Sequence, residues 1–232
     1  KFTPGDVVRI DALTDDGQYH AWTEVTVPQR PHEIADIDTV TIPMTKYYYT
    51  QNFLRYKINI KDRSNEDNYY RLIMDKQMTV KDYNEETGEF VSRTIHRYHF
   101  ISREDIVLTD GQPTNSDDED NGMFDTVKNI YGVFDDSRFK NTSYTMTVYN
   151  QTNVEGLSKY GTNVKMDIIV RLLSITETEY YYLKALNLAD SDAYDETINE
   201  PIKYPGNVHG GVGIVGISTE TSKIIHIEKP WI

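Results

Sequence analysis

Apolar and polar side chains alternate with a period of two along much of the chain. In residues 54–61 every second side chain is apolar, and the side chains between are Arg, Lys or Asn. Residues 164–173 repeat the pattern, although Ile169 and Leu173 add apolar groups to the polar face. Because successive side chains of a strand point to opposite faces, both stretches are predicted to be β-strands with one buried face.

Shorter stretches with the same alternation predict further strands. They are residues 7–13, 21–27, 69–74, 94–101, 143–149, 212–217 and 223–228. Turn-forming sequences separate several of them: Asp-Asp-Gly at residues 15–17, and Asn-Glu-Glu-Thr-Gly at residues 84–88. Strands joined by such turns form antiparallel hairpins, so the sequence predicts an all-β fold, an antiparallel β-sandwich.

One helix is predicted near residues 177–188. Two overlapping capping boxes, Ser174-x-x-Glu177 and Thr176-x-x-Glu179, precede the run Tyr-Tyr-Tyr-Leu-Lys-Ala-Leu at residues 180–186. At helical spacing Tyr182, Ala185 and Leu186 share one face, which we expect to cover a sheet.

A domain boundary is predicted where two prolines, Pro28 and Pro31, end the strand before them. Residues 1–31 supply only one hairpin, and an isolated hairpin is marginally stable in water. Residues 32–232 are long enough for a larger β-sandwich domain. Residues 109–121 are rich in Asp, Asn, Ser and Pro without apolar periodicity, which indicates a loop.

The charge and the cysteine content of the chain limit the kinds of molecule that it is expected to bind. A net charge of -13 repels phosphate backbones and anionic lipid surfaces, so neither nucleic acid nor direct membrane binding is expected. The absence of cysteine excludes disulfides, thiolate zinc sites and thiol catalysis in these residues. No apolar run reaches the roughly 18 residues of a membrane span, and any export signal would precede Lys1.

The glycine-rich stretch at residues 207–216 contains Gly211, Gly213 and Gly216 in the spacing of a dinucleotide-binding motif. That motif requires a strand before it and a helix after it, and the residues that follow alternate like a strand. We therefore interpret these glycines as structural. Gly210 and Gly211 are expected to let the chain turn closely before a strand, so that replacing Gly211 with Val destabilises the fold.

Other candidate chemistry is weak. His96 and His99 have an odd offset within a predicted strand, which points their rings to opposite faces. The remaining histidines are scattered, and a catalytic or metal site assembled only by folding stays an alternative. The acidic loop at residues 115–122 offers oxygen ligands for calcium, but Lys128 occupies the position where an EF-hand carries its bidentate Glu. A solvated acidic loop is favoured, with weak calcium binding kept as a hypothesis.

Tyrosines cluster at residues 47–49, 69–70 and 180–182. Exposed tyrosine rings could stack on sugars, whereas strand alternation predicts that at least one tyrosine of each pair lies in the core. Core packing is the favoured interpretation.

Five segments of the chain carry a family resemblance. They are Pro4-Gly5-Asp6 with Ala21 and residues 23–28; Asp62 with Asn68-Tyr69-Tyr70; residues 133–136 with Phe139, Asn141 and Tyr144; Ser174, Glu177, Tyr180 and Tyr182; and Glu200-Pro201 with residues 207–213. Together they resemble the Bacteroidota cell-surface lipoproteins grouped as the domain-of-unknown-function 4249 family. The resemblance covers nearly the whole chain, although Arg63 stands where the family usually has proline and Val215 where it tends to have Phe.

This resemblance implies an exported lipoprotein, held at the outer membrane by a lipidated cysteine upstream of Lys1 and often associated with nutrient-uptake systems. It carries over no catalytic, cofactor or metal residue. On the basis of this resemblance, we interpret residues 1–31 as the last strands of a truncated immunoglobulin-like domain. The resulting hypothesis is a non-enzymatic surface protein that acts beside an outer-membrane transporter or another surface protein. A glycan- or peptide-binding module and an unrecognised hydrolase are the alternatives.

Overall fold

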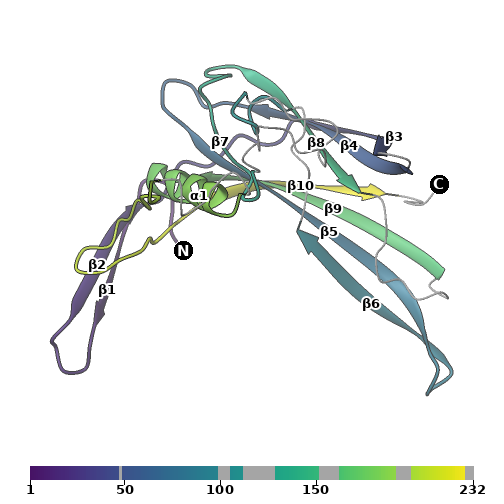
Figure 1. The fold of residues 1–232 in the computed structure, drawn as a ribbon, viewed down its shortest axis with the longest axis horizontal. Helices are drawn as coiled ribbons and strands as arrows, with labels where there is room; N and C mark the ends of the chain where they lie inside the picture. Colours follow the sequence, from purple (N-terminus) through teal and green to yellow (C-terminus); the bar gives the residue numbers. More distant parts are fainter. Residues whose placement is uncertain (47–48, 99–104, 112–128, 152–161, 192–199, 228–232) are drawn as a thin grey trace.

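The structure is a computed structural model that describes residues 1–46, 49–98, 105–111, 129–151, 162–191 and 200–227. Two antiparallel sheets pack face to face, one helix covers the outer face of the larger sheet, and a two-stranded hairpin projects from one end (Figure 1). The predicted all-β sandwich with one helix is thus confirmed.

The larger sheet has the strand order β10-β9-β5-β6, with β7 beside β5. Its members are β5 (Tyr69–Asn84), β6 (Glu89–Tyr98), β7 (Val133–Asp135), β9 (Thr162–Ile175) and β10 (Thr219–Ile227). The smaller sheet has the order β3-β4-β8, formed by β3 (Asp36–Lys46), β4 (Tyr49–Lys61) and β8 (Ser143–Gln151). Every pairing within the two sheets is antiparallel.

The main core lies between these sheets. Alternate residues of β4 and β8 face alternate residues of β5 and β9, as the period of two predicts. Tyr56, Ile58, Met146, Ile168 and Val170 are fully buried in it. Burying aliphatic and aromatic side chains from four strands in one layer is the main source of stability for such a sandwich.

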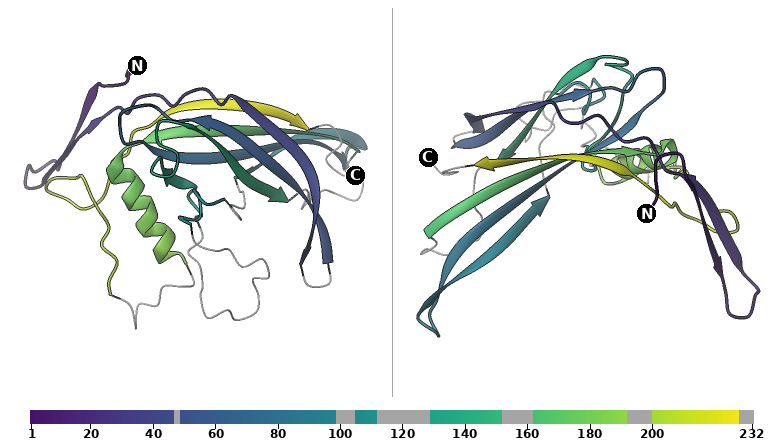
Figure 2. Two further views of the ribbon diagram at one scale, coloured as in Figure 1. Left: turned by 90° about the horizontal axis from the view of Figure 1, so that it is seen from above. Right: turned by 180° about the vertical axis from the view of Figure 1, so that it is seen from behind.

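Helix α1 (Glu177–Ala189) packs on the opposite face of the larger sheet (Figure 2). Its buried residues are Tyr180, Leu183 and Asn187, and they contact a second apolar cluster that includes Val133 and Leu173. The helix position is confirmed. The predicted face is displaced, because Tyr182 and Leu186 lie only at the margin of the buried stripe.

The sequence missed two strands. β3 contains Pro43, which argues against a central strand, and among the described residues β3 is an edge strand that pairs with β4 alone. β7 has three residues, too few for a periodic pattern. The predicted strand at 212–217 is wrong: residues 211–218 form no strand, and Val212 is fully exposed. The hairpin predicted at residues 84–88 joins β5 to β6.

The projecting hairpin consists of β1 (Val7–Leu13) and β2 (His20–Thr26), which form a sheet of their own. It contacts the segment that precedes β10, since Trp22 and His209 form an isolated antiparallel bridge. In Figure 2 this segment runs alongside β2, away from the sandwich. The hairpin therefore depends on a C-terminal segment for its packing.

Candidate functional site

Two segments of the predicted family resemblance meet in a buried polar cluster. The Asn68 amide donates hydrogen bonds to Asp62 Oδ1 at 3.1 Å and to Asp136 Oδ2 at 3.1 Å. The Tyr70 hydroxyl donates to Asp62 Oδ1 at 3.0 Å, and the Asn141 backbone N–H donates to Asp62 Oδ2 at 2.8 Å. These hydrogen bonds join strand β5 to the turns that follow β4 and β7.

Burial gives this cluster a structural role. Asp62, Asn68 and Asp136 are each at most 3% exposed. Burial raises the pKa of Asp136, although hydrogen bonds from Asn68 oppose that effect. Since the carboxylate oxygens accept hydrogen bonds from neighbouring protein groups, Asp62 and Asp136 hold the loops to the sandwich.

The glycine-rich stretch forms a closed loop held by Asn207. The Asn207 side chain donates to the carbonyl of Val215 at 2.9 Å and accepts from its N–H at 2.9 Å. Gly210 has a φ of +75°, and a Cβ on it would lie 2.2 Å from the carbonyl oxygen of His20. The structural interpretation of these glycines fits this geometry, but Gly210 rather than Gly211 is the position that requires glycine.

This loop brings His209 onto the hairpin. The N–H of Trp22 donates to the carbonyl of His209 at 3.0 Å, and the reverse bond is 2.8 Å. The imidazole of His209 stacks on the Trp22 indole with centroids 4.2 Å apart, and the Arg9 guanidinium lies 4.5 Å from the indole centroid. The three groups form a layered stack across β1, β2 and the loop.

Acidic residues surround the stack. Arg9 Nε lies 2.7 Å from Asp11 Oδ2, Arg9 also pairs with Glu24, and His20 Nε2 lies 2.8 Å from Asp11 Oδ1. Hydrogen bonds from Arg9, then from His20, lower the pKa of Asp11 to about 2. We call this set the hairpin–loop surface; its residues are Arg9, Asp11, His20, Trp22, Glu24 and His209.

Apolar side chains around the hairpin–loop surface are unusually exposed. Val7, Leu13 and Tyr19 are 63%, 65% and 71% exposed, and Val212 on the adjoining loop is fully exposed. Single exposed apolar residues are ordinary, whereas exposed apolar residues beside ordered charged and aromatic groups also occur at protein contact surfaces. Sequence reasoning missed this site because Trp22 and His209 are brought together only by folding.

The predicted tyrosine positions divide between core and surface. Tyr70 and Tyr180 are buried, which confirms that each of these runs places one ring in the core. Tyr69 packs 5.0 Å from Tyr180, while Tyr181 and Tyr204 are about half exposed. The run at 47–49 begins outside the described residues.

Of the predicted histidine pair and calcium loop, His96 alone lies among the described residues. His96 Nδ1 lies 3.4 Å from Asp75 Oδ2, and His99 and the acidic loop 115–122 lie outside the described residues. Within the part of the chain that the structure describes, no three His, Asp or Glu side chains converge as metal ligands.

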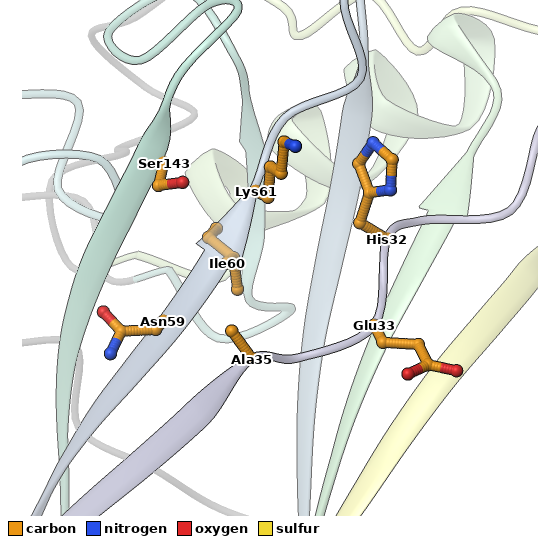
Figure 3. A pocket seen from close by; sticks show the side chains of 7 residues that line it. All are labelled: His32, Glu33, Ala35, Asn59, Ile60, Lys61 and Ser143. Carbon is orange, nitrogen blue, oxygen red and sulfur yellow. The ribbon is translucent and has the colours of Figure 1, made fainter.

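A hollow of about 540 Å³ lies where the segment after β2 crosses β4. Figure 3 shows Ser143 of β8 and His32 of the crossing segment on either side of Lys61. Glu33 is the one carboxylate that lines it, so this hollow does not supply the pair of facing acids of a glycosidase. The full lining is His32, Glu33, Ala35, Asn59, Ile60, Lys61 and Ser143.

No helix among the described residues is long and apolar enough to cross a membrane. Comparison with protein families gives one match: the model described as "Domain of unknown function (DUF4249)" covers residues 1–224. No curated protein and no solved structure matches the chain.

Proposed function

Because the chain belongs to the DUF4249 family, we propose that it is a non-catalytic binding domain of an exported surface protein. The observation that carries this proposal is the Arg9, Trp22 and His209 stack on the projecting hairpin. Two aromatic rings and an arginine, already ordered before a partner arrives, are the side chains that protein interfaces favour.

The partner that we propose is another surface protein, with an outer-membrane transporter as the first candidate. This assignment, the Bacteroidota origin and the upstream lipid anchor rest on the family resemblance described above. The chemistry of the hairpin–loop surface agrees with a protein partner, because its charged and aromatic groups lie beside the exposed Val212 of the adjoining loop. The charge of -13 makes a neutral or cationic contact surface on the partner the better match.

Co-purification from native membranes tests the proposal. The wild-type chain and a Trp22→Ala variant are used as baits, and Phe90→Ala at the far tip of the β5–β6 hairpin is the control, since Phe90 is an exposed aromatic residue outside the hairpin–loop surface. We expect wild type and Phe90→Ala to recover a transporter and Trp22→Ala to lose it. Recovery of no outer-membrane transporter, or equal recovery by Trp22→Ala, contradicts the proposal.

Glycan binding is a second candidate, favoured by one observation. Tyr181 and Tyr204 are about half exposed and lie on α1 and on the segment before β10. Exposed aromatic rings are the groups that stack on sugar faces. A glycan array probed with wild type and with a Tyr181→Ala, Tyr204→Ala double variant decides it: signal lost in the variant supports this candidate, and no wild-type signal removes it.

A further inference from the structure

The segment that joins β2 to β3 forms one wall of the hollow shown in Figure 3. The N–H of Ala35 donates to the carbonyl of Asn59 on β4 at 3.1 Å. Lys223 Nζ of β10 donates to the carbonyl of Ala35 at 2.8 Å, and Ile34 is buried in the main core. None of these contacts uses a polar side chain of the lining, so the wall is held in place independently of them.

The opposite wall is the end of the smaller sheet. Ser143 of β8 is the register partner of Lys61, the last residue of β4. In Figure 3 the Lys61 side chain lies between Ser143 and His32 of the joining segment. An ammonium, an imidazole and a hydroxyl thus lie along one side of the hollow.

These three side chains are not engaged with the rest of the protein. Among the described residues, none of them forms an ion pair or a side-chain hydrogen bond. Lys61 differs in this from Lys140 and Lys184, each of which pairs with an aspartate. Because the chain has 37 acidic and 24 basic residues, a lysine without an acidic partner is a departure from the general charge balance.

The local charge at the hollow is opposite in sign to the net charge of the chain. Lys223 stands behind the wall, and among the described residues neither it nor Lys61 pairs with a carboxylate. Glu33 is the one carboxylate of the lining, and in Figure 3 it points away from Lys61 and His32. Asp62, the next residue after Lys61, is turned into the buried polar cluster. An anion is therefore attracted here although the whole chain carries a charge of -13.

We propose that this hollow binds a small molecule through a carboxylate group. The Lys61 ammonium and the His32 imidazole donate to the carboxylate, and the Ser143 hydroxyl donates from the other side of Lys61. The volume of about 540 Å³ lies within the range of roughly 300–1,000 Å³ for small-molecule pockets, which suits an acidic sugar or the carboxyl end of a short peptide. Since Lys61 and His32 are exposed, the expected Kd is on the order of 1 mM.

A titration followed by protein NMR tests the proposal, with glucuronate and N-acetylglycine as the probes. The first carries its carboxylate on a sugar ring and the second at a peptide end, and glucose and N-acetylglycinamide are their uncharged counterparts. We expect one or both carboxylates to shift the signals of Lys61, Ser143 and Ala35, and the uncharged counterparts to leave them unchanged. A response to one probe alone supports the proposal and identifies the kind of ligand. No response to either probe well above the expected Kd, or an equal response to the uncharged counterparts, overturns it.

Three variants test the role of charge in the same titration. Lys61→Gln is expected to weaken binding about tenfold or more. Lys57→Gln is the matched control, because Lys57 is an exposed lysine of β4 outside the lining, and it should bind as wild type does. Glu33→Gln removes the negative charge of the lining and is expected to tighten binding, a direction that damage to the fold would not produce. Equal weakening by the two lysine variants, or weaker binding by Glu33→Gln, contradicts the proposal.

The lining of the hollow shares no residue with the hairpin–loop surface. Carboxylate binding and the transporter partner proposed above can therefore fail separately.

Discussion

The carbonyl oxygen of His20 lies 2.2 Å from the position that a Cβ on Gly210 would occupy. The backbone of Gly210, in the loop before β10, therefore lies close against the start of β2. The neighbouring residues His209 and Trp22 stack on each other, and this arrangement leads to the first prediction.

Replacing Gly210 with Ala is expected to detach the loop from the hairpin. Gly210 has a positive φ, and the Cβ of an alanine there would clash with the carbonyl oxygen of His20. We therefore expect the free energy of docking the loop onto the hairpin to become less favourable by about 1–3 kcal/mol. In a Trp231→Phe background Trp22 is the one remaining tryptophan, and its fluorescence during urea titration reports the docking. Gly211→Ala is the matched control, because Gly211 has no positive φ and its Cβ would meet only side chains at 3.3 and 3.4 Å. Equal effects of the two substitutions would refute this account.

Replacing Asn68 with Ala is expected to destabilise the whole sandwich. The substitution removes hydrogen bonds to two buried carboxylates, Asp62 and Asp136, and hydrogen bonds to charged groups are worth about 1.5–3 kcal/mol each. Urea unfolding followed by circular dichroism should therefore show a loss of about 3 kcal/mol or more. The exposed neighbour Asp67 pairs with Lys140 at the surface. Asp67→Asn should change stability by less than about 1 kcal/mol, and a similar loss there would contradict the role given to Asn68.

Replacing Glu179 with Gln is expected to stabilise the protein at neutral pH. Burial raises the pKa of Glu179, its Oε2 has no hydrogen-bond partner among the residues that the structure describes, and Gly216 packs directly against it. A raised folded-state pKa means that the stability linked to this group is fully present below the unfolded pKa and is lost as pH rises through the folded value. Glutamine does not ionise, so the Glu179→Gln variant does not lose this stability as the pH rises.

The melting temperatures of wild type and Glu179→Gln should therefore nearly coincide near pH 4 and diverge at pH 7.5, with the variant higher. We expect a gain of about 0.5–1 kcal/mol at neutral pH, a modest figure because the side chain is only partly buried. Glu177→Gln is the control in the same helical turn: Glu177 is exposed and accepts from the Tyr69 hydroxyl at 2.9 Å, so its loss should not stabilise. A variant that is less stable than wild type at pH 7.5 would contradict this prediction.

Replacing Thr176 with Ala is expected to weaken α1. The Thr176 side chain caps the helix by accepting from the Glu179 N–H, so alanine should cost about 1 kcal/mol, measured by thermal unfolding. Thr176→Ser keeps the accepting hydroxyl and should recover most of that loss. If serine and alanine are equally destabilising, the hydroxyl is not the source of the effect.

The sequence alone determined the class of fold and most of its elements, because alternation of apolar residues is a local property. The strands around Ile58 and Ile168, the β5–β6 hairpin and the helix after Thr176 each follow from neighbours within a few residues. Local sequence patterns also indicated that the glycines around Gly210 are structural. The strand predicted from the same kind of pattern at residues 212–217 does not form, because the alternating apolar side chains there have no partner strand among the described residues.

Only the tertiary structure decided which residues meet across long separations. The contacts of Asn68 with Asp136 and of Trp22 with His209 join distant parts of the chain, and no periodicity encodes such a pairing. The tertiary structure also decided which face of α1 is buried, since that depends on how the helix lies over Val133 and Leu173.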